Sequence, residues 1–143
     1  MFIGEYSYNI DHKKRLAIPS KFRRVLGKKA VITRGLDNCL VVYPIEEWKK
    51  LTKKLENLPT SKIDARGFVR IMLSGAVDVK FDKLGRVLVP DYLKNYASLK
   101  KEVRVIGLSN KIEIWDEKKW TEYRQKTEKE IGDMASRLEE LGI

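Results

Sequence analysis

The sequence predicts an α+β fold built from two tandem copies of one unit, and two observations lead to that prediction. A nine-residue stretch occurs twice, at 11–19 and at 82–90, and both copies read Asp-x-x-x-Arg, three apolar residues and Pro. The offset of 71 residues is about half of the 143-residue chain. Each copy also lies within the same order of elements: strand, turn, strand, short helix, hairpin, helix. Self-similarity at a fixed offset indicates an internal repeat.

The similarity between the two copies extends beyond the motif. Downstream of it the offset becomes 72 residues, and Gly-Leu-Asp-Asn at 35–38 then matches Gly-Leu-Ser-Asn at 107–110. Trp48 matches Trp120 at the same offset. Chance similarity between lysine-rich segments would not keep Gly, Asn and Trp in one order, so we treat the chain as an internal duplication.

The first half predicts six elements. They are a strand over 2–10, a turn over 11–14, a buried strand over 16–18, a short helix over 21–26, a hairpin of strands 30–34 and 39–43, and an amphipathic helix from Trp48 to Leu58. Asp at the first turn position bonds its own backbone two residues on. Pro19 ends the buried strand because proline has no amide donor. Ser20 is the predicted N-cap of the short helix.

The second half repeats this plan. It predicts a strand over 77–81, a turn over 82–85, a buried strand over 87–89, a short helix capped by Asp91, a hairpin of strands 103–106 and 111–115, and a long C-terminal helix. Along that helix, spacings of three and four separate Trp120, Tyr123, Thr127, Ile131, Met134, Leu138 and Leu141. This stripe predicts one amphipathic helix that packs against the body of the protein or a neighbouring subunit.

The repeat divides the chain into four parts. Residues 1–60 form the first unit, 61–74 a linking helix, 75–118 the second unit and 119–143 the C-terminal helix. Pro59 ends the last helix of the first unit, and Ser61 begins the linking helix.

The net charge of +10 is concentrated in the first half of the chain. Residues 1–71 contain 16 basic and 7 acidic residues, a net +9, and residues 72–143 contain 14 and 13, a net +1. Residues 12–34 hold nine Lys or Arg and no acid. Such a run is often only a solvated face, but this one begins inside the repeated turn and therefore favours a surface for a polyanion.

Composition excludes several classes of function. A single His and a single Cys, His12 and Cys39, supply neither a metal site nor an intrachain disulfide, and we expect Cys39 to be a packed apolar residue. No phosphate loop, dinucleotide fingerprint or acid–base cluster is present, so we expect no cofactor, no small-molecule substrate and no enzymatic activity. No membrane-length apolar run and no signal peptide is visible, so a cytoplasmic protein is expected.

The two motif arginines, Arg15 and Arg86, are the strongest site candidates. An arginine just past a tight turn points outward from a rigid platform, and its planar fork suits bidentate contact with guanine or with phosphate. The alternative is that each arginine pairs with the Asp of its own turn, Asp11 or Asp82, and only holds the loop. The residues alone leave both interpretations open.

The two turns differ where one has Lys14 and the other Gly85. Glycine takes a positive φ freely, whereas lysine there requires another turn shape or a strain of about 1 kcal/mol. The first half should supply most of the phosphate contacts, so Lys13 with Lys14 should outweigh Lys80 with Lys83. Weaker phosphate candidates on the first short helix are Lys21, Arg23 and Arg24.

The paired motifs closely resemble the MraZ family, the two-repeat bacterial relatives of the SpoVT/AbrB swapped-hairpin DNA-binding domains, over essentially the whole chain. The family pattern usually has Lys-Gly before the Arg, whereas here the first copy has Lys13-Lys14 and the second has Leu84-Gly85. The resemblance implies a double swapped-hairpin, AbrB-like β-barrel with pseudo-twofold symmetry, in which the halves exchange hairpins, plus flanking helices.

The resemblance also implies a function. The expected protein is a sequence-specific DNA-binding transcriptional regulator that controls the division and cell-wall gene cluster through short G-rich direct repeats in its promoter. Its expected partners are double-stranded DNA, on the nucleoid, and further copies of the chain in a ring-shaped homo-oligomer. Contact with DNA is expected from Arg15, Arg86, Lys13, Lys14 and Lys83, and orientation of the turns from Asp11, Asp82 and Gly85.

Two other functions fit the same features. A non-specific nucleoid-associated protein would bind specific and random duplex equally well. A structural oligomeric interaction module would use its C-terminal helix to pair with a protein partner, and binding of nucleic acid would be incidental. Deleting residues 120–143 and measuring assembly separately from DNA affinity distinguishes this module.

Overall fold

Strands from the two halves of the chain are interleaved in the main sheet. In the computed structural model, which describes residues 1–143, six antiparallel strands lie in the order β1-β7-β8-β4-β3-β5. Their bounds are Glu5–Asn9 (β1), Glu102–Gly107 (β7), Ile112–Asp116 (β8), Leu40–Pro44 (β4), Lys29–Arg34 (β3) and Val77–Lys80 (β5). The strand β1 pairs with β7, and β5 pairs with β3. Each half therefore adds one edge strand to the hairpin of the other half.

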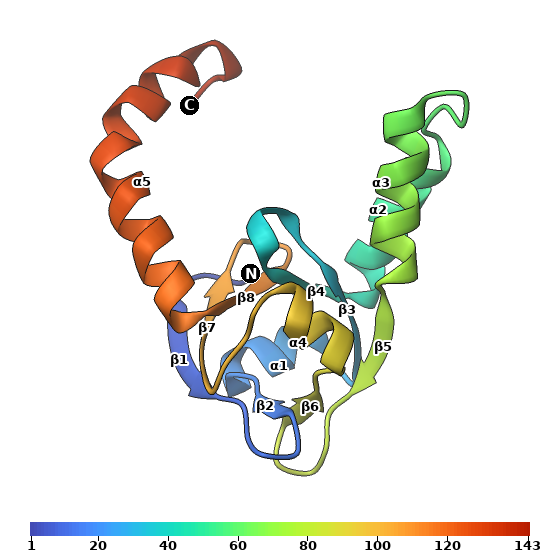
Figure 1. Ribbon diagram of the computed structural model, residues 1–143, viewed down its shortest axis with the longest axis vertical. Helices are drawn as coiled ribbons and strands as arrows, with labels where there is room; N and C mark the ends of the chain where they lie inside the picture. The colour runs from blue at the N-terminus through green and yellow to red at the C-terminus, as the bar shows by residue number, and fades with distance from the viewer.

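The two copies of the motif meet in a second sheet of two strands. The strands β2 (Arg15–Ala17) and β6 (Arg86–Leu88) are antiparallel, and the buried residues Leu16 and Val87 lie opposite each other. The turns that precede these strands lie together at the end of the molecule opposite two helical arms (Figure 1). No strand pairing joins β1 to β5, so the six-stranded sheet is open and the barrel that the resemblance implies is not closed.

Equivalent short helices contribute to one shared core. The helices α1 (Ser20–Leu26) and α4 (Asp91–Tyr96) bury Phe22 and Leu93, which occupy matching positions in the repeat. Phe22 packs edge-on against Phe2 and Tyr6, with ring centroids 5.4 and 5.3 Å away. Edge-to-face pairs contribute about 0.5–1.5 kcal/mol each beyond the area that they bury. The core cluster contains residues from both halves, so neither half encloses it alone.

The predicted caps of both short helices are wrong. The N-cap positions are Pro19 and Pro90, and neither helix has a side-chain cap hydrogen bond. A cap needs an extended backbone, which the proline already has, so each helix begins at the next residue. Ser20 and Asp91 are consequently the first residues inside helices α1 and α4, and the Asp91 carboxylate is free to bind elsewhere.

Two helical arms extend from the body on opposite sides (Figure 1). One consists of α2 (Ile45–Glu56) and α3 (Ile63–Ser74), and the other of α5 (Glu117–Arg137) followed by a 3-10 turn at Glu139–Leu141. The carboxylate of Asp116 caps α5 by accepting a hydrogen bond from the Lys119 N–H at 3.2 Å. Although α5 has 21 residues, neither it nor any other helix has the apolar run that crossing a membrane requires.

The C-terminal arm leaves most of its apolar stripe exposed. Near the body, Trp120 and Tyr123 pack around Trp115, with ring centroids 5.4 and 5.0 Å away. Further out, Ile131 is 64% exposed and Leu141 is 76% exposed. The stripe therefore does not pack along its own body, and the continuous helix ends at Arg137 instead of Leu141, with a 3-10 turn after it.

Candidate nucleic-acid interface

The first turn (11–14) and the second turn (82–85) have the same backbone geometry. Lys14 has a φ of 62° and Gly85 a φ of 74°. In each turn, the N–H of this residue donates to the carbonyl of the turn's Asp at 3.0 Å. Lys14 therefore adopts the left-handed conformation, which costs about 1–2 kcal/mol. The alternative of a differently shaped first turn is wrong.

An Asp side chain holds each turn and its arginine together. In the first turn, Asp11 Oδ1 accepts hydrogen bonds from the backbone N–H groups of Lys13 and Arg15, both at 2.9 Å, and Oδ2 accepts one from Arg15 Nε at 2.8 Å. Asp82 accepts the three equivalent bonds at the same three lengths. The arginine backbone N–H is the largest cause of the lowered pKa of both carboxyl groups, and the arginine side chain lowers the pKa further.

The pairing of each arginine leaves the outer end of its guanidinium group available. Asp11 and Asp82 bind the Nε atoms, and the Nη atoms of Arg15 make no hydrogen bond. One Nη of Arg86 lies 3.6 Å from Asp11 Oδ2. The two arginine side chains remain 29% and 25% exposed. For Arg15 the Asp pair and an outward contact are thus compatible, because they use different nitrogen atoms of the same fork, and Arg86 keeps one Nη outside its two ion pairs.

Each turn rests on the short helix of the other half. The ammonium group of Lys14 lies 2.6 Å from the Asp91 carboxylate on α4. In the other turn, a Cβ built on Gly85 would stand 2.4 Å from Cζ of Arg23 on α1. Position 14 therefore has room for a lysine side chain, which pairs with Asp91. Position 85 has no room even for a Cβ, because Arg23 occupies the space. The sequence difference between the turns follows from these two neighbours.

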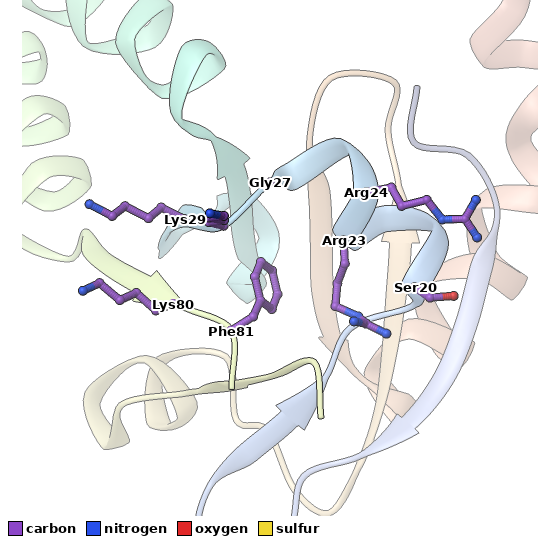
Figure 2. A pocket seen from close by; sticks show the side chains of 8 residues that line it. Ser20, Arg23, Arg24, Gly27, Lys29, Lys80 and Phe81 are labelled. Atoms are coloured by element: carbon purple, nitrogen blue, oxygen red, sulfur yellow. The ribbon is translucent and has the colours of Figure 1, made fainter. Parts of the chain in front are cut away.

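A hollow lined by cations opens beside the second turn (Figure 2). Its volume is about 710 Å³, and the lining side chains include Arg23, Arg24, Lys28, Lys29, Lys80 and Phe81. We call this set the cationic hollow. It has no acidic lining residue. Arg23 belongs both to the cationic hollow and to the contact with Gly85, so the hollow adjoins the second turn.

The remaining predicted site residues have exposed side chains. Lys13 and Lys83 are exposed on the turns, and Lys21 is exposed on α1. Lys28 and Lys29 were not predicted as site residues, although the acid-free run 12–34 contains both. Cys39 is buried as expected; its thiol donates to the Leu36 carbonyl, and burial raises the pKa of the thiol.

The fold and the paired turns define a protein made of two related halves, each of which presents an Asp-held arginine. The family model described as "MraZ protein, putative antitoxin-like" matches residues 1–71 and again residues 72–140. The chain therefore belongs to the MraZ family, with one family repeat in each half.

Relatives match over their full length. The chain is 52% identical to the transcriptional regulator MraZ of Halothermothrix orenii, 51% identical to that of Clostridium acetobutylicum and 48% identical to that of Alkaliphilus metalliredigens. Each alignment covers 143 residues and 100% of both chains. These relatives are named as transcriptional regulators, in agreement with the expectation that the chain is not an enzyme.

Proposed function

We propose that this protein is a sequence-specific transcriptional regulator that binds double-stranded DNA through its two turns. The observation that supports the proposal best is the matched pair of arginines, each held through Nε by an Asp of its own turn at 2.8 Å. Relatives about half identical to the chain are named as transcriptional regulators. The surplus of basic residues in the first half supplies charge for phosphate contacts.

The Asp-held arginines suit the reading of bases. Each carboxylate orients the guanidinium group before DNA arrives, so less side-chain freedom is lost on binding. The two Nη groups then donate to O6 and N7 of guanine, the commonest specific contact in the major groove. Lys13, Lys14 and Lys83 contact the adjoining phosphates, and Gly85 keeps the second turn tight. The structure offers Lys14 a competing partner in Asp91.

The finer properties of this regulator rest on the family resemblance. They are control of the division and cell-wall gene cluster, short G-rich direct repeats as the target, and a place on the nucleoid in the cytoplasm. The strand exchange between β1 and β7 and between β5 and β3 supports a swapped-hairpin arrangement about a pseudo-twofold axis near Leu16 and Val87. The division at 1–60, 61–74, 75–118 and 119–143 remains our guide for truncations.

A ring-shaped homo-oligomer completes the proposal. Both arms carry exposed apolar side chains at one end of the molecule, such as Phe68 and Ile71 on α3 and Ile131 on α5. Contacts between the arms of neighbouring copies would cover them and leave the turns free for DNA. Several weakly binding copies joined in this way gain effective concentration on successive repeats.

A footprint of the protein on the DNA upstream of its own gene tests the proposal. We expect protection of short repeated segments and an affinity for them at least about 10³-fold above that for random duplex of equal length at the same salt concentration. Equal affinity for both would favour a non-specific nucleoid protein instead.

The exposed arms also support a second function, that of a structural interaction module. A chain lacking residues 120–143 separates the two functions. If the shortened chain no longer assembles but a single chain still binds DNA with its normal affinity, then the helix is needed only for oligomer formation by a DNA-binding protein. If the shortened chain and the full chain both fail to bind DNA, the module is the better description.

A further inference from the structure

The cationic hollow is electrostatically unfavourable as it stands. Lys29 on β3 and Lys80 on β5 are direct partners in the antiparallel register. Like charges in opposed positions on neighbouring strands destabilise a sheet. None of the five cations of the cationic hollow forms an ion pair with a carboxylate of this chain. Five unpaired cations around one concave surface provide a site for an anion.

The cationic hollow lies beside the proposed reading surface. Arg23 covers Gly85 of the second turn, and Phe81 directly precedes Asp82, the first residue of that turn. Figure 2 shows Phe81 between Lys80 and Arg23. An anion in the cationic hollow therefore lies next to whatever the second turn contacts. A duplex held by the turn has its phosphate backbone in this neighbourhood.

The other half lacks such a hollow. In the matching register of β1 and β7, Asn9 pairs with Glu102, whereas β5 and β3 pair Lys80 with Lys29. The hollow along that edge has a volume of about 440 Å³, and its lining includes Glu102 and Glu117 and no cation. The pseudo-symmetric body thus has one cationic flank and one flank that carries carboxylates.

We infer that the cationic hollow is a phosphate site for the DNA backbone, and that it gives the flank of the second turn a backbone contact that the other flank lacks. The inference rests on the proposed function. Two equivalent turns alone would contact a duplex equally on both flanks. A phosphate site on one flank adds a backbone contact on that side only.

Salt titrations of two matched triple variants test the phosphate site. The hollow variant is Lys28→Gln, Lys29→Gln, Lys80→Gln, and the control variant is Lys94→Gln, Lys100→Gln, Lys101→Gln, which loses the same charge from the other flank. Each lost phosphate contact lowers the slope of log K against log salt by about 0.9. We expect this slope to fall by about two units in the hollow variant and by less than one unit in the control variant. The loss should occur on operator and random duplex alike, because phosphate contacts carry no sequence information directly.

The outcomes separate this inference from the proposed function. Equal slopes for the two variants, with operator preference intact, overturn the phosphate site alone. If the unmodified chain does not prefer operator to random duplex, the proposed function is overturned. The salt slopes of the two variants on random duplex then still decide whether the hollow binds phosphate. Inorganic phosphate and a nucleoside triphosphate serve as probes of a free ligand. If they bind in the cationic hollow while the duplex slope stays unchanged, the site belongs to a small phosphorylated ligand and the DNA assignment is wrong. Melting curves of both variants confirm the fold, and Lys80→Gln alone replaces the triple change if that chain is unfolded.

Discussion

The guanidinium group of Arg23 covers Gly85, although the two residues belong to different halves of the chain. A Cβ on the glycine would stand 2.4 Å from Cζ of the arginine, and Arg23 Nε also donates to the Ile18 carbonyl at 3.0 Å. The arginine is therefore held between its own half and the turn of the other half. The two turns keep one backbone shape with different residues because different side chains lie above them.

Replacing Gly85 with alanine should destabilise the protein by more than backbone strain alone. A left-handed alanine costs about 1–2 kcal/mol, and the new Cβ would also displace Arg23. The control makes the same change in a chain that also carries Arg23→Ala, where the backbone strain remains but the guanidinium group is gone. Urea unfolding measures the loss that Gly85→Ala causes in each of the two chains. Equal losses would show that Arg23 moves aside without cost.

Arg15→Ala and Arg86→Ala should weaken operator binding by similar amounts, about 1–3 kcal/mol each. Similar losses are expected because both arginines have the same Asp contact at 2.8 Å, and the additional ion pair of Arg86 with Asp11 is longer, at 3.6 Å. Lysine at either position keeps the charge but lacks the planar fork, so it should restore little of the loss. Binding isotherms on one operator at fixed salt measure these changes. Full affinity in both alanine variants, with the fold intact, would remove the proposed base contact.

The sequence predicts the repeat from the similarity of two segments 71 residues apart, and it predicts the order of elements and the turn residues from local patterns. It does not predict the contacts between the halves. Lys14 meets Asp91 across 77 residues, and Lys29 meets Lys80 through strand pairing alone. The prediction that Ser20 and Asp91 are caps is wrong because the proline before each of them already has the extended backbone of an N-cap. A helical stripe likewise shows which residues share a face, but does not show what covers them.

Acid should weaken the turns, because the pKa values of Asp11 and Asp82 are lowered in the folded protein. Below the ordinary value of 3.8, the unfolded chain binds more protons than the folded one. The stabilisation is complete above that value and is lost as the pH falls through the lowered pKa. Asp11→Asn with Asp82→Asn should therefore be less stable near neutrality and lose less stability between about pH 5 and pH 3.

Thermal melting across this pH range measures the effect of the two turn carboxyls. The single change Asp133→Asn removes a charge from the exposed side of α5 and serves as the control. Parallel curves for the double variant and the unmodified chain would show that these carboxyls do not control acid stability.

Cutting the chain after Thr127 should reduce the size of the assembly without lowering the melting temperature of the body. The cut removes the exposed part of α5 and keeps the aromatic contacts of Trp120 and Tyr123 with Trp115. A cut after Asp116 removes those contacts as well, and it should also lower the melting temperature because Trp115 is only 5% exposed. Sedimentation and melting separate the two effects. An unchanged assembly after the cut at Thr127 would show that the outer stripe is not an interface.

The last prediction concerns the two lysines of the first turn. From charge counts alone, Lys13 with Lys14 should outweigh Lys80 with Lys83 in phosphate contacts. We now expect the opposite order, because Asp91 lies 2.6 Å from the Lys14 ammonium group and Lys80 lines the cationic hollow. Lys13→Gln should flatten the salt dependence of DNA binding by about 0.9 units, the value of one phosphate contact, and Lys14→Gln should flatten it less.

Asp91→Asn provides the matching test, because it releases Lys14 without changing the turn. In that background, Lys14→Gln should flatten the slope as much as Lys13→Gln does. While Asp91 is present, changing Lys80 and Lys83 together to Gln should flatten the salt slope more than changing Lys13 and Lys14 together does. If Lys14→Gln has the full effect even with Asp91 in place, then the ion pair opens on binding DNA. The phosphate would then compete successfully with the carboxylate for the same ammonium group.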